Sequence, residues 1–295
     1  MDMTKVTRPA RKLRQRRIMG QGDSARDFDT SESMKNAGIL DVFPIFRTAR
    51  LGQKIRRSPQ SPLCGVALTK LRRCGAVIVA AGSASRMGGI DKVMAPLGGE
   101  PMIVRTVRAF QDCDAIRDIV VVTREDLIRP ITSLCAGMDK VIAVVAGGAS
   151  RQESVQLGLN ALPGKTELAA IHDGARPLVS YEVIDRAVRA ANTYGAAAPA
   201  VPVKDTVKRV QGGVVTDTPD RASLRAVQTP QVFDFDLLRG ALKKAKDEGA
   251  QVTDDCSAVE RMGFSVKIVE GEERNIKVTT PMDLKIAEML LEEMQ

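Results

Sequence analysis

Short apolar runs alternate with amphipathic segments from residue 75 onward, and this pattern predicts an α/β fold. Four runs are continuous and mainly apolar, as strands covered on both faces of a sheet require; they span residues 75–81, 118–123, 141–145 and 168–172. Residues 101–110 and 181–192 instead repeat apolar positions along one helix face. Because crossovers between parallel strands are right-handed, we expect a doubly wound, mostly parallel, Rossmann-like sheet.

Residues 205–221 fall outside this alternation and predict a protruding β-hairpin arm. Two β-like runs flank Gly212-Gly213, which is a turn signal for a hairpin. An isolated pair of strands is only marginally stable in water, so we expect the arm to pack on another surface. A flap over the protein's own pocket is one arrangement that satisfies this requirement.

The charge is divided unevenly between two parts of the chain, which predicts an N-terminal extension. The chain has 295 residues and a net charge of +8. Residues 1–74 contain 17 Lys and Arg against 6 Asp and Glu, whereas residues 75–295 contain 27 against 30. We interpret residues 1–74 as a disordered basic extension, or as a start codon placed too far upstream with Met34 as one alternative. A tether to RNA or to a membrane surface is the competing interpretation.

Composition excludes several kinds of site and partner. A single histidine, His172, rules out sites that need two imidazoles, such as the usual zinc hydrolase centres. The five cysteines form no C-x-x-C pair, which favours reduced thiols and a cytoplasmic protein. Nine aromatic residues without tryptophan argue against a nucleic-acid partner. The sequence contains no run of about 18 apolar residues, so we expect no membrane span.

The loop directly after the first predicted strand is rich in glycine and basic residues. It reads GSASRMGGIDK over residues 82–92. Its backbone N–H groups could approach phosphate oxygens, and Arg86 and Lys92 add two cations. The spacing matches neither G-x-x-x-x-G-K-[ST] nor G-x-G-x-x-G, so neither a P-loop NTPase nor a Rossmann dehydrogenase follows. An ordinary strand-to-helix connection with two solvated cations is the alternative.

Two further loops follow predicted strands and carry polar residues. Residues 147–154 read GGASRQES, a glycine pair before a helix, which is a weak signal by itself. Residues 172–177 read HDGARP. Asp173 at a strand's carboxyl end is a natural Mg²⁺ ligand beside a phosphate loop, although an aspartate can also cap the next helix. We assign no chemistry to His172, since a lone histidine is more often structural.

These loops together resemble the 2-C-methyl-D-erythritol 4-phosphate cytidylyltransferase family. The resemblance also includes Thr229-Pro230-Gln231, Thr253-Asp254-Asp255 and residues 275–279, in order over residues 75–295. It implies a Mg²⁺-dependent enzyme that transfers CMP from CTP to methylerythritol phosphate, in isoprenoid precursor synthesis. Two alternatives remain: a sister cytidylyltransferase acting on ribitol 5-phosphate, and a nucleotide- or RNA-binding protein that uses the basic tail.

The resemblance also implies roles for individual residues. The catalytic residues it implies are Arg86, Lys92, Arg221 and Lys277. The CTP-binding residues it implies are Ala80, Ala81, Gly82, Gly148, Ser154 and Gly174. Arg176, Thr229 and Thr253 would bind the sugar phosphate, and Asp173 would hold Mg²⁺. It further implies a homodimer in which the arm reaches the neighbouring subunit, so that Arg221 acts in trans.

Four positions depart from the residues that this family commonly carries. Ala84 stands where glycine is frequent, Ala149 where an acidic residue is common, and Val93-Met94 where Gln and an aromatic residue are frequent. None of these departures removes a cation or the expected Mg²⁺ ligand. Ala149 bears most directly on how the base or the ribose is held.

Overall fold

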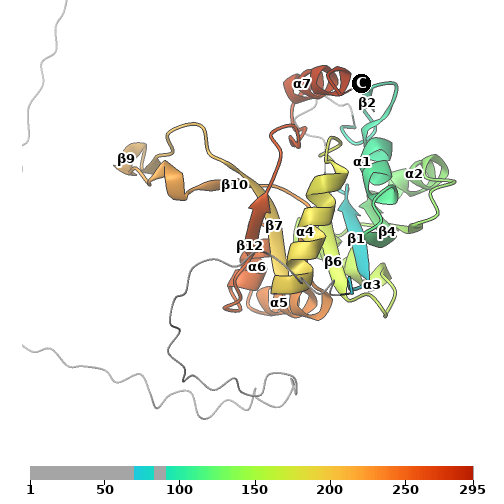
Figure 1. Ribbon diagram of the computed structural model, residues 1–295, viewed down its shortest axis with the longest axis horizontal. Helices are drawn as coiled ribbons and strands as arrows, with labels where there is room; N and C mark the ends of the chain where they lie inside the picture. Colours follow the sequence, from blue (N-terminus) through green and yellow to red (C-terminus); the bar gives the residue numbers. More distant parts are fainter. Residues whose placement is uncertain (1–69, 83–90, 295) are drawn as a thin grey trace, which may run out of the picture. The chain divides into compact units, whose positions relative to one another are not determined.

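The computed structural model describes residues 70–82 and 91–294, which form a mixed sheet flanked by helices. The eight-stranded sheet has the order β10-β7-β11-β6-β1-β4-β5, and β12 also pairs with β7 (Figure 1). Its strands are β1 (Cys74–Val79), β4 (Ile116–Thr123), β5 (Val141–Ala146), β6 (Leu168–Asp173), β7 (Ala196–Pro202), β10 (Arg225–Val227), β11 (Gln231–Asp234) and β12 (Lys267–Glu270). Strands β6, β1, β4 and β5 are parallel neighbours, whereas β11 is antiparallel to β6 and β7. The predicted α/β fold with a mostly parallel sheet is confirmed.

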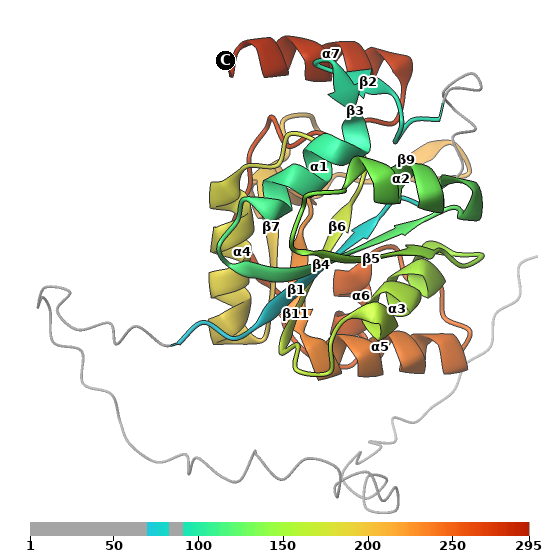
Figure 2. The same ribbon diagram turned by 90° about the vertical axis from the view of Figure 1, so that its right-hand side faces the viewer.

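Helices cover both faces of this sheet (Figure 2). One face is covered by α1 (Met102–Gln111), α2 (Ile128–Leu134) and α4 (Tyr181–Tyr194). The other is covered by α3 (Arg151–Ala161), α5 (Phe235–Asp247) and α6 (Asp255–Glu260). Strand β1 serves both layers, because Ala76 and Ile78 join one apolar cluster while Val77 joins the other. This two-sided burial explains why β1 is a continuous apolar run.

One prediction about the sheet is wrong, and one strand of the sheet was not predicted. Strand β5 was expected to be covered on both faces, but it is the last strand in the order and its residues are half-buried or exposed. Strand β7 was not predicted. Its sequence, AAAPAVP, is rich in alanine and contains two prolines, which are poor strand formers, yet it is paired on both sides.

Helix α7 (Pro281–Glu292) closes a smaller third cluster near the C-terminus. It packs with a short hairpin, β2 (Pro96–Leu97) and β3 (Glu100–Pro101). The helix begins at a capping box, in which the Thr280 side chain accepts a hydrogen bond from the backbone N–H of Asp283. Val278, at the start of this segment, is fully buried in the same cluster. The segment that contains Lys277 is therefore anchored by packing.

The predicted hairpin arm is present and stands apart from the main sheet. Strands β8 (Arg209–Gln211) and β9 (Val214–Asp217) form their own antiparallel pair. Gly212 and Gly213 both have positive φ, 58° and 80°, as the tight turn between the strands requires. Every residue of the two strands is exposed, and the arm projects away from the sheet (Figure 1).

The described chain begins shortly before β1 and is tied to the domain there. Arg72 forms an ion pair with Asp234 at 2.9 Å, and Arg73 forms one with Asp118 at 2.7 Å. The expected basic extension, residues 1–74, lies outside the described residues as far as residue 69. In the described part of the chain, no helix is long and apolar enough to cross a membrane.

Candidate active site

A pocket of about 430 Å³ lies beyond the carboxyl ends of β1 and β6, where ligands of such sheets bind. Eight of the predicted site residues line it: Ala80, Ala81, Gly82, Lys92, Gly148, Ser154, Asp173 and Lys277. They come from segments spread over almost two hundred residues of sequence. The fold therefore brings the two ends of the first predicted loop, residues of the next two loops and Lys277 to one place.

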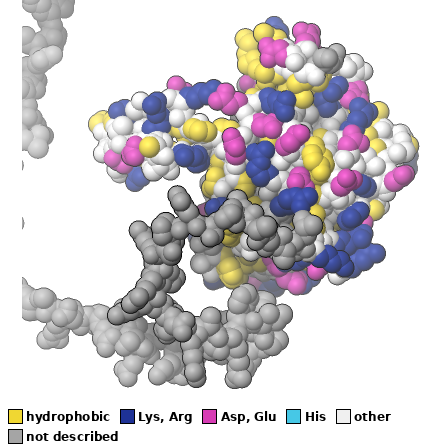
Figure 3. All heavy atoms as spheres, viewed as in Figure 1, with side chains coloured by type: hydrophobic (Ala, Val, Ile, Leu, Met, Phe, Trp, Pro, Cys, Tyr) yellow, Lys and Arg dark blue, Asp and Glu magenta, His cyan; other side chains and the backbone are white. Residues whose placement is uncertain are grey.

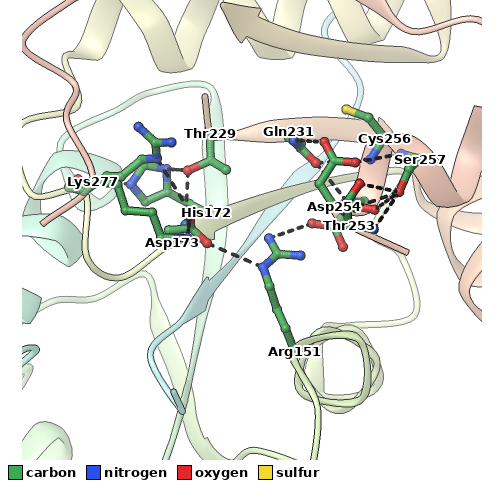
Figure 4. Close-up of polar contacts among 12 residues, drawn as sticks. Arg151, His172, Asp173, Thr229, Gln231, Thr253, Asp254, Cys256, Ser257 and Lys277 are labelled. Carbon is green, nitrogen blue, oxygen red and sulfur yellow. Dashed lines mark hydrogen bonds and ion pairs between the residues drawn. The ribbon is translucent and has the colours of Figure 1, made fainter. Parts of the chain in front are cut away.

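Asp173 lies at the centre of a cluster of cations in this pocket (Figure 4). Its Oδ2 is 2.8 Å from Lys277 Nζ and 3.6 Å from Arg176 Nε, and its Oδ1 is 3.5 Å from Arg151 Nε. Burial raises the pKa of Asp173, but Lys277, then Arg151 and Arg176, lower it by more, so its pKa lies well below the usual range. The carboxylate is therefore ionised at neutral pH.

Arg151 and Asp255 are two charged residues to which the sequence analysis gave no role. Arg151 Nη2 lies 2.8 Å from Asp255 Oδ2, so one guanidinium joins the pocket carboxylate to a second carboxylate. Asp255 begins α6 and is only 1% exposed, and its burial raises its pKa. Both residues stand inside quoted motifs, but their pairing depends on how α3 and α6 pack together.

The glycine pair before α3 allows a close approach of two loops. A Cβ on Gly147 would lie 2.3 Å from the Cβ of Ala81, and one on Gly148 would lie 2.2 Å from the Cγ of Glu153. Gly148 N–H donates to Ser154 Oγ at 3.1 Å. Ser154 in turn donates to the backbone of Ser150, the residue that caps α3. The Ser154 hydroxyl thus holds the loop that lines the pocket.

Three predicted residues lie beside the pocket and support it. Gly174 packs the end of β6 against β1, because a Cβ there would lie 3.0 Å from the Cβ of Ala80. Arg176 donates from Nη1 to the backbone oxygen of Asn275 at 2.7 Å. Thr229 is 4% exposed, and its Oγ1 accepts a hydrogen bond from the backbone N–H of Asp173 at 3.1 Å.

Two predicted residues that the structure describes, Thr253 and Arg221, are not brought to the pocket lining. Thr253 is exposed just before α6, where its N–H donates to Ser257 Oγ. Arg221 begins the short 3₁₀ turn η2 (Arg221–Ser223) at the base of the arm, and its Nη1 donates to the backbone oxygen of Lys204 at 2.7 Å. It lines a separate surface cavity with Lys204 and Arg225. Arg86 lies outside the described residues.

His172 is buried behind Asp173 and is not a candidate acid or base. Burial lowers its pKa to about 4, so the imidazole is neutral at physiological pH. Its Nδ1 lies 3.0 Å from Thr229 Oγ1, and its Nε2 lies 3.2 Å from the backbone oxygen of Arg176. The expectation that His172 is a hydrogen-bonded structural residue agrees with these contacts.

The pocket is suited to anions, and its lining includes one carboxylate. Among the described residues that line it, Asp173 is the only acidic side chain, beside Lys92, Arg151 and Lys277. The described residues contain no group of three potential ligands that could hold a metal by itself. One ionised carboxylate fits Mg²⁺, which commonly takes one or two carboxylates and completes its shell with phosphate oxygens and water.

Comparison with known proteins links residues 74–293 to one family. The family model for 2-C-methyl-D-erythritol 4-phosphate cytidylyltransferase matches that whole range. A protein of that name from Symbiobacterium thermophilum is 46% identical over 219 residues, covering 74% of this chain and 92% of the relative. A protein of the same name from Geobacillus kaustophilus is 48% identical over 219 residues, covering 73% and 96%.

Solved structures give the same match for the fold. The 4-diphosphocytidyl-2C-methyl-D-erythritol synthase of Anaerococcus prevotii superimposes with a TM-score of 0.69 at 32% identity, covering 75% of this chain and 96% of that one. The 2-C-methyl-D-erythritol 4-phosphate cytidylyltransferase of Thermus thermophilus gives a TM-score of 0.62 at 34% identity, covering 75% and 99%. The similarity therefore spans the described domain in both sequence and structure.

Proposed function

The chain belongs to the 2-C-methyl-D-erythritol 4-phosphate cytidylyltransferase family and transfers CMP from CTP to that sugar phosphate, and we propose that the pocket around Asp173 is its active site. The observation that carries the assignment is the cluster of Lys277, Arg151 and Arg176 around the Asp173 carboxylate. The reaction brings two phosphates together, and this cluster supplies positive charge where they meet.

CTP occupies the side of the pocket formed by the two loops that approach each other. The backbone of Ala80, Ala81 and Gly82 and that of Gly148 line this side. Small side chains leave the peptide groups of these loops accessible, so that they can form hydrogen bonds with the base. Gly174 and Ser154 support this side of the pocket through the contacts described above.

Asp173 would hold the Mg²⁺ ion, since it is the acidic side chain among the described residues that line the pocket. When bound, the ion neutralises charge on the triphosphate and orients it for attack. Asp173 is suited to this role because its lowered pKa keeps it ionised. Arg151 would keep a carboxylate partner in Asp255 if Asp173 bound the cation.

The acceptor phosphate binds on the side of the pocket lined by Lys277, with Arg176 beside it. Both cations contact Asp173, and both emerge from segments held by packing or hydrogen bonds. Thr229 and Thr253 complete the acceptor site in this proposal, with Thr229 acting through the Asp173 backbone. Positioning two like-charged reactants is itself a large share of catalysis in phosphoryl-type transfer.

The reaction needs positioned charges and no covalent intermediate. An oxygen of the acceptor phosphate attacks the α-phosphorus of CTP, the bond to the β-phosphate oxygen breaks, and pyrophosphate leaves. Negative charge on the α-phosphate is stabilised by Lys92, which lines the pocket, and by Lys277. The family resemblance adds Arg86 to these cations.

The arm supports a homodimer in which Arg221 serves the neighbouring active site. Within its own chain Arg221 does not line the pocket, and it stands at the base of a projecting hairpin. Figure 3 shows apolar side chains on the surface of the arm, where Val210, Val214 and Val215 are each more than half exposed. A partner subunit would cover them. The alternative is a flap that closes over its own pocket.

The alternatives differ in what they predict for the acceptor and the tail. The relatives described above are named for methylerythritol phosphate, which favours that acceptor over ribitol 5-phosphate. An RNA-binding role would leave the cation cluster around Asp173 without a purpose. We also place the enzyme in the cytoplasm, because the four described cysteines are free and buried.

The test is Mg²⁺-dependent release of pyrophosphate from CTP, with methylerythritol 4-phosphate or ribitol 5-phosphate as acceptor. We expect turnover with methylerythritol phosphate only, and a loss of about a hundredfold or more in kcat for Lys92→Ala. Lys243→Ala, on the exposed face of α5, is the matched control and should behave as wild type. Turnover with ribitol phosphate alone would change the substrate, and silence with both acceptors would refute the proposal.

A further inference from the structure

His172 is a buried polar residue that the reaction proposed above does not use. It is the penultimate residue of β6 and is fully buried, with its ring 4.8 Å from that of Phe110. Both ring nitrogens nevertheless have polar neighbours. A buried imidazole with two partners, directly before the metal-binding carboxylate, needs an explanation beyond packing.

The directions of these hydrogen bonds follow from the chemistry of the partners. The backbone oxygen of Arg176 can only accept, so Nε2 of His172 donates to it at 3.2 Å. A neutral ring carries one N–H, so Nδ1 accepts from the Thr229 hydroxyl at 3.0 Å. Thr229 Oγ1 then accepts from the backbone N–H of Asp173 at 3.1 Å. Each donor in this chain has one acceptor.

The chain of hydrogen bonds closes into a ring of four residues. Asn275 donates from Nδ2 to the backbone oxygen of Thr229 at 3.0 Å. Arg176 Nη1 donates to the backbone oxygen of Asn275 at 2.7 Å. We call His172, Thr229, Asn275 and Arg176 the histidine ring. It joins three stretches of chain that are far apart in sequence.

Each of these stretches carries or contacts a charged group of the proposed active site. Asp173 follows His172 directly and is also bonded to Thr229. Arg176 is itself a member of the histidine ring and lies 3.6 Å from Asp173. Lys277 stands two residues after Asn275 and lies 2.8 Å from Asp173. The ring therefore sets the mutual positions of one carboxylate and two cations.

We infer that His172 is a positioning residue, which fixes Asp173, Arg176 and Lys277 through Thr229 and Asn275 without touching either substrate. The inference rests on the proposed roles of those three charged residues. Small displacements matter in such a site, since a shift of about 1 Å can cost about a hundredfold in rate. His172 is also the member of the ring that packs against the Phe110 side chain in the core.

The test compares variants that break the hydrogen bonds of the histidine ring with variants that keep them. His172→Phe keeps an aromatic ring beside Phe110 but removes both hydrogen bonds. Thr229→Val keeps the shape of the side chain and removes the hydroxyl, whereas Thr229→Ser keeps the hydroxyl. Thr166→Val is the control, because Thr166 is similarly buried at the opposite end of β6 and its hydroxyl has no hydrogen-bond partner.

We expect His172→Phe and Thr229→Val each to lower kcat/KM for the acceptor about tenfold or more. The KM for methylerythritol phosphate should rise more than the KM for CTP, because Arg176 and Lys277 face the acceptor. Thr229→Ser should restore most of the loss, and Thr166→Val should leave both constants unchanged. The double variant should lose no more than the worse single variant, since both changes break the same ring.

Several outcomes would overturn the inference. A folded His172→Phe variant with wild-type kcat and KM values would do so, as would losses that add fully in the double variant. A fall only in the fraction of active enzyme, with both KM values unchanged, would indicate a merely structural role. If His172→Phe does not fold, the comparison of Thr229→Val with Thr229→Ser decides the question.

The tautomer of His172 gives a check that does not depend on activity. Nitrogen-15 NMR of the wild-type enzyme should show a neutral ring with its proton on Nε2. A proton on Nδ1 would refute the histidine ring whatever the kinetics. An inactive wild-type enzyme with the expected tautomer would instead refute the proposed function and leave the ring in place.

Discussion

Asp173 faces three cations at once, and this imbalance of charge is the central feature of the site at the scale of single residues. One carboxylate cannot neutralise Lys277, Arg176 and Arg151, so the pocket keeps positive charge for incoming phosphates. Asp255 reduces this excess of positive charge, because it forms an ion pair with Arg151. The arrangement is therefore prepared for anions before any substrate binds.

Asp173→Asn tests this balance directly. The amide cannot compensate the cations or bind Mg²⁺ as a carboxylate does, so kcat/KM should fall by about a hundredfold to a thousandfold. The Mg²⁺ concentration needed for half-maximal rate should also rise. Steady-state kinetics over a magnesium titration measures both effects. Asp236→Asn, which alters an exposed ion pair on α5, should change neither.

Much of the site could be predicted from the sequence, and the missing part has a physical cause. Lys92, Gly148 and Asp173 line one pocket, as expected from the way the carboxyl ends of parallel strands meet at one edge, and their roles stay predictions. The pairing of Arg151 with Asp255 could not be predicted, since it depends on side chains from two helices that meet only after the sheet has formed. The histidine ring was missed for the same reason.

At the scale of elements, helix α7 holds the segment that ends in the active site. Its first turn is fixed by Asp283, whose carboxylate accepts hydrogen bonds from Thr279 N–H, Thr279 Oγ1 and Thr280 N–H. Although burial raises the pKa of Asp283, these hydrogen bonds lower it by more, so its pKa lies below the usual value. Lys277 stands just before this turn, so the cap and the lysine that we propose as catalytic share a short stretch of chain.

Asp283→Ala should therefore lower stability in a pH-dependent way. A carboxylate whose pKa is lowered on folding stabilises the protein above its unfolded pKa, near 3.9, and loses that contribution as pH falls through the folded pKa. We expect a loss of about 1 kcal/mol at pH 7, or about 2–4 °C in Tm, that shrinks toward zero below pH 3. Thermal melts from pH 7 to 2.5 measure this difference.

Glu288→Ala, on the exposed side of the same helix, is the control for that series and should leave Tm unchanged. A destabilisation by Asp283→Ala that stays constant down to pH 2.5 would contradict the capping role.

The four strands predicted as apolar runs are all present, whereas β7 was missed because pairing on both sides overrides its poor strand propensity. The pattern of apolar residues therefore predicts those strands whose own residues favour a strand.

At the scale of the whole molecule, the charge is divided between the N-terminal residues and the domain. Residues 75–295 carry 27 basic and 30 acidic residues, so the excess of positive charge belongs to residues 1–74. The domain nevertheless concentrates cations around Asp173. Catalysis thus depends on local placement of charge within a nearly neutral domain.

Deleting residues 1–69 should leave turnover within about twofold of wild type, because no proposed catalytic residue lies there. Deleting residues 1–73 should in addition lower Tm, which the shorter deletion should not do, since it removes the ion pairs of Arg72 with Asp234 and of Arg73 with Asp118. Pyrophosphate release and thermal melts compare the two proteins. Loss of turnover in the shorter deletion would favour a working role for the basic residues.

The position of Arg221 outside its own pocket makes the assembly testable by mixing two defective proteins. Arg221→Ala and Asp173→Asn should each be nearly inactive as homodimers. If Arg221 acts in trans, a mixed dimer has one site with Asp173 from one subunit and Arg221 from the other. An equal mixture that exchanges subunits freely should then recover roughly a quarter of wild-type activity, since about half the dimers are mixed and each has one intact site.

The same mixture separates the dimer from a flap that closes on its own chain. In a flap, every site takes Asp173 and Arg221 from one subunit, so no combination of the two variants produces an intact site and activity stays absent. Adding Val210→Asp to both variants before they are mixed tests whether the exposed valines of the arm form the contact between subunits. Loss of recovery together with a monomer in sedimentation would mean that the arm holds the subunits together; recovery unchanged by this substitution would locate the dimer contact elsewhere.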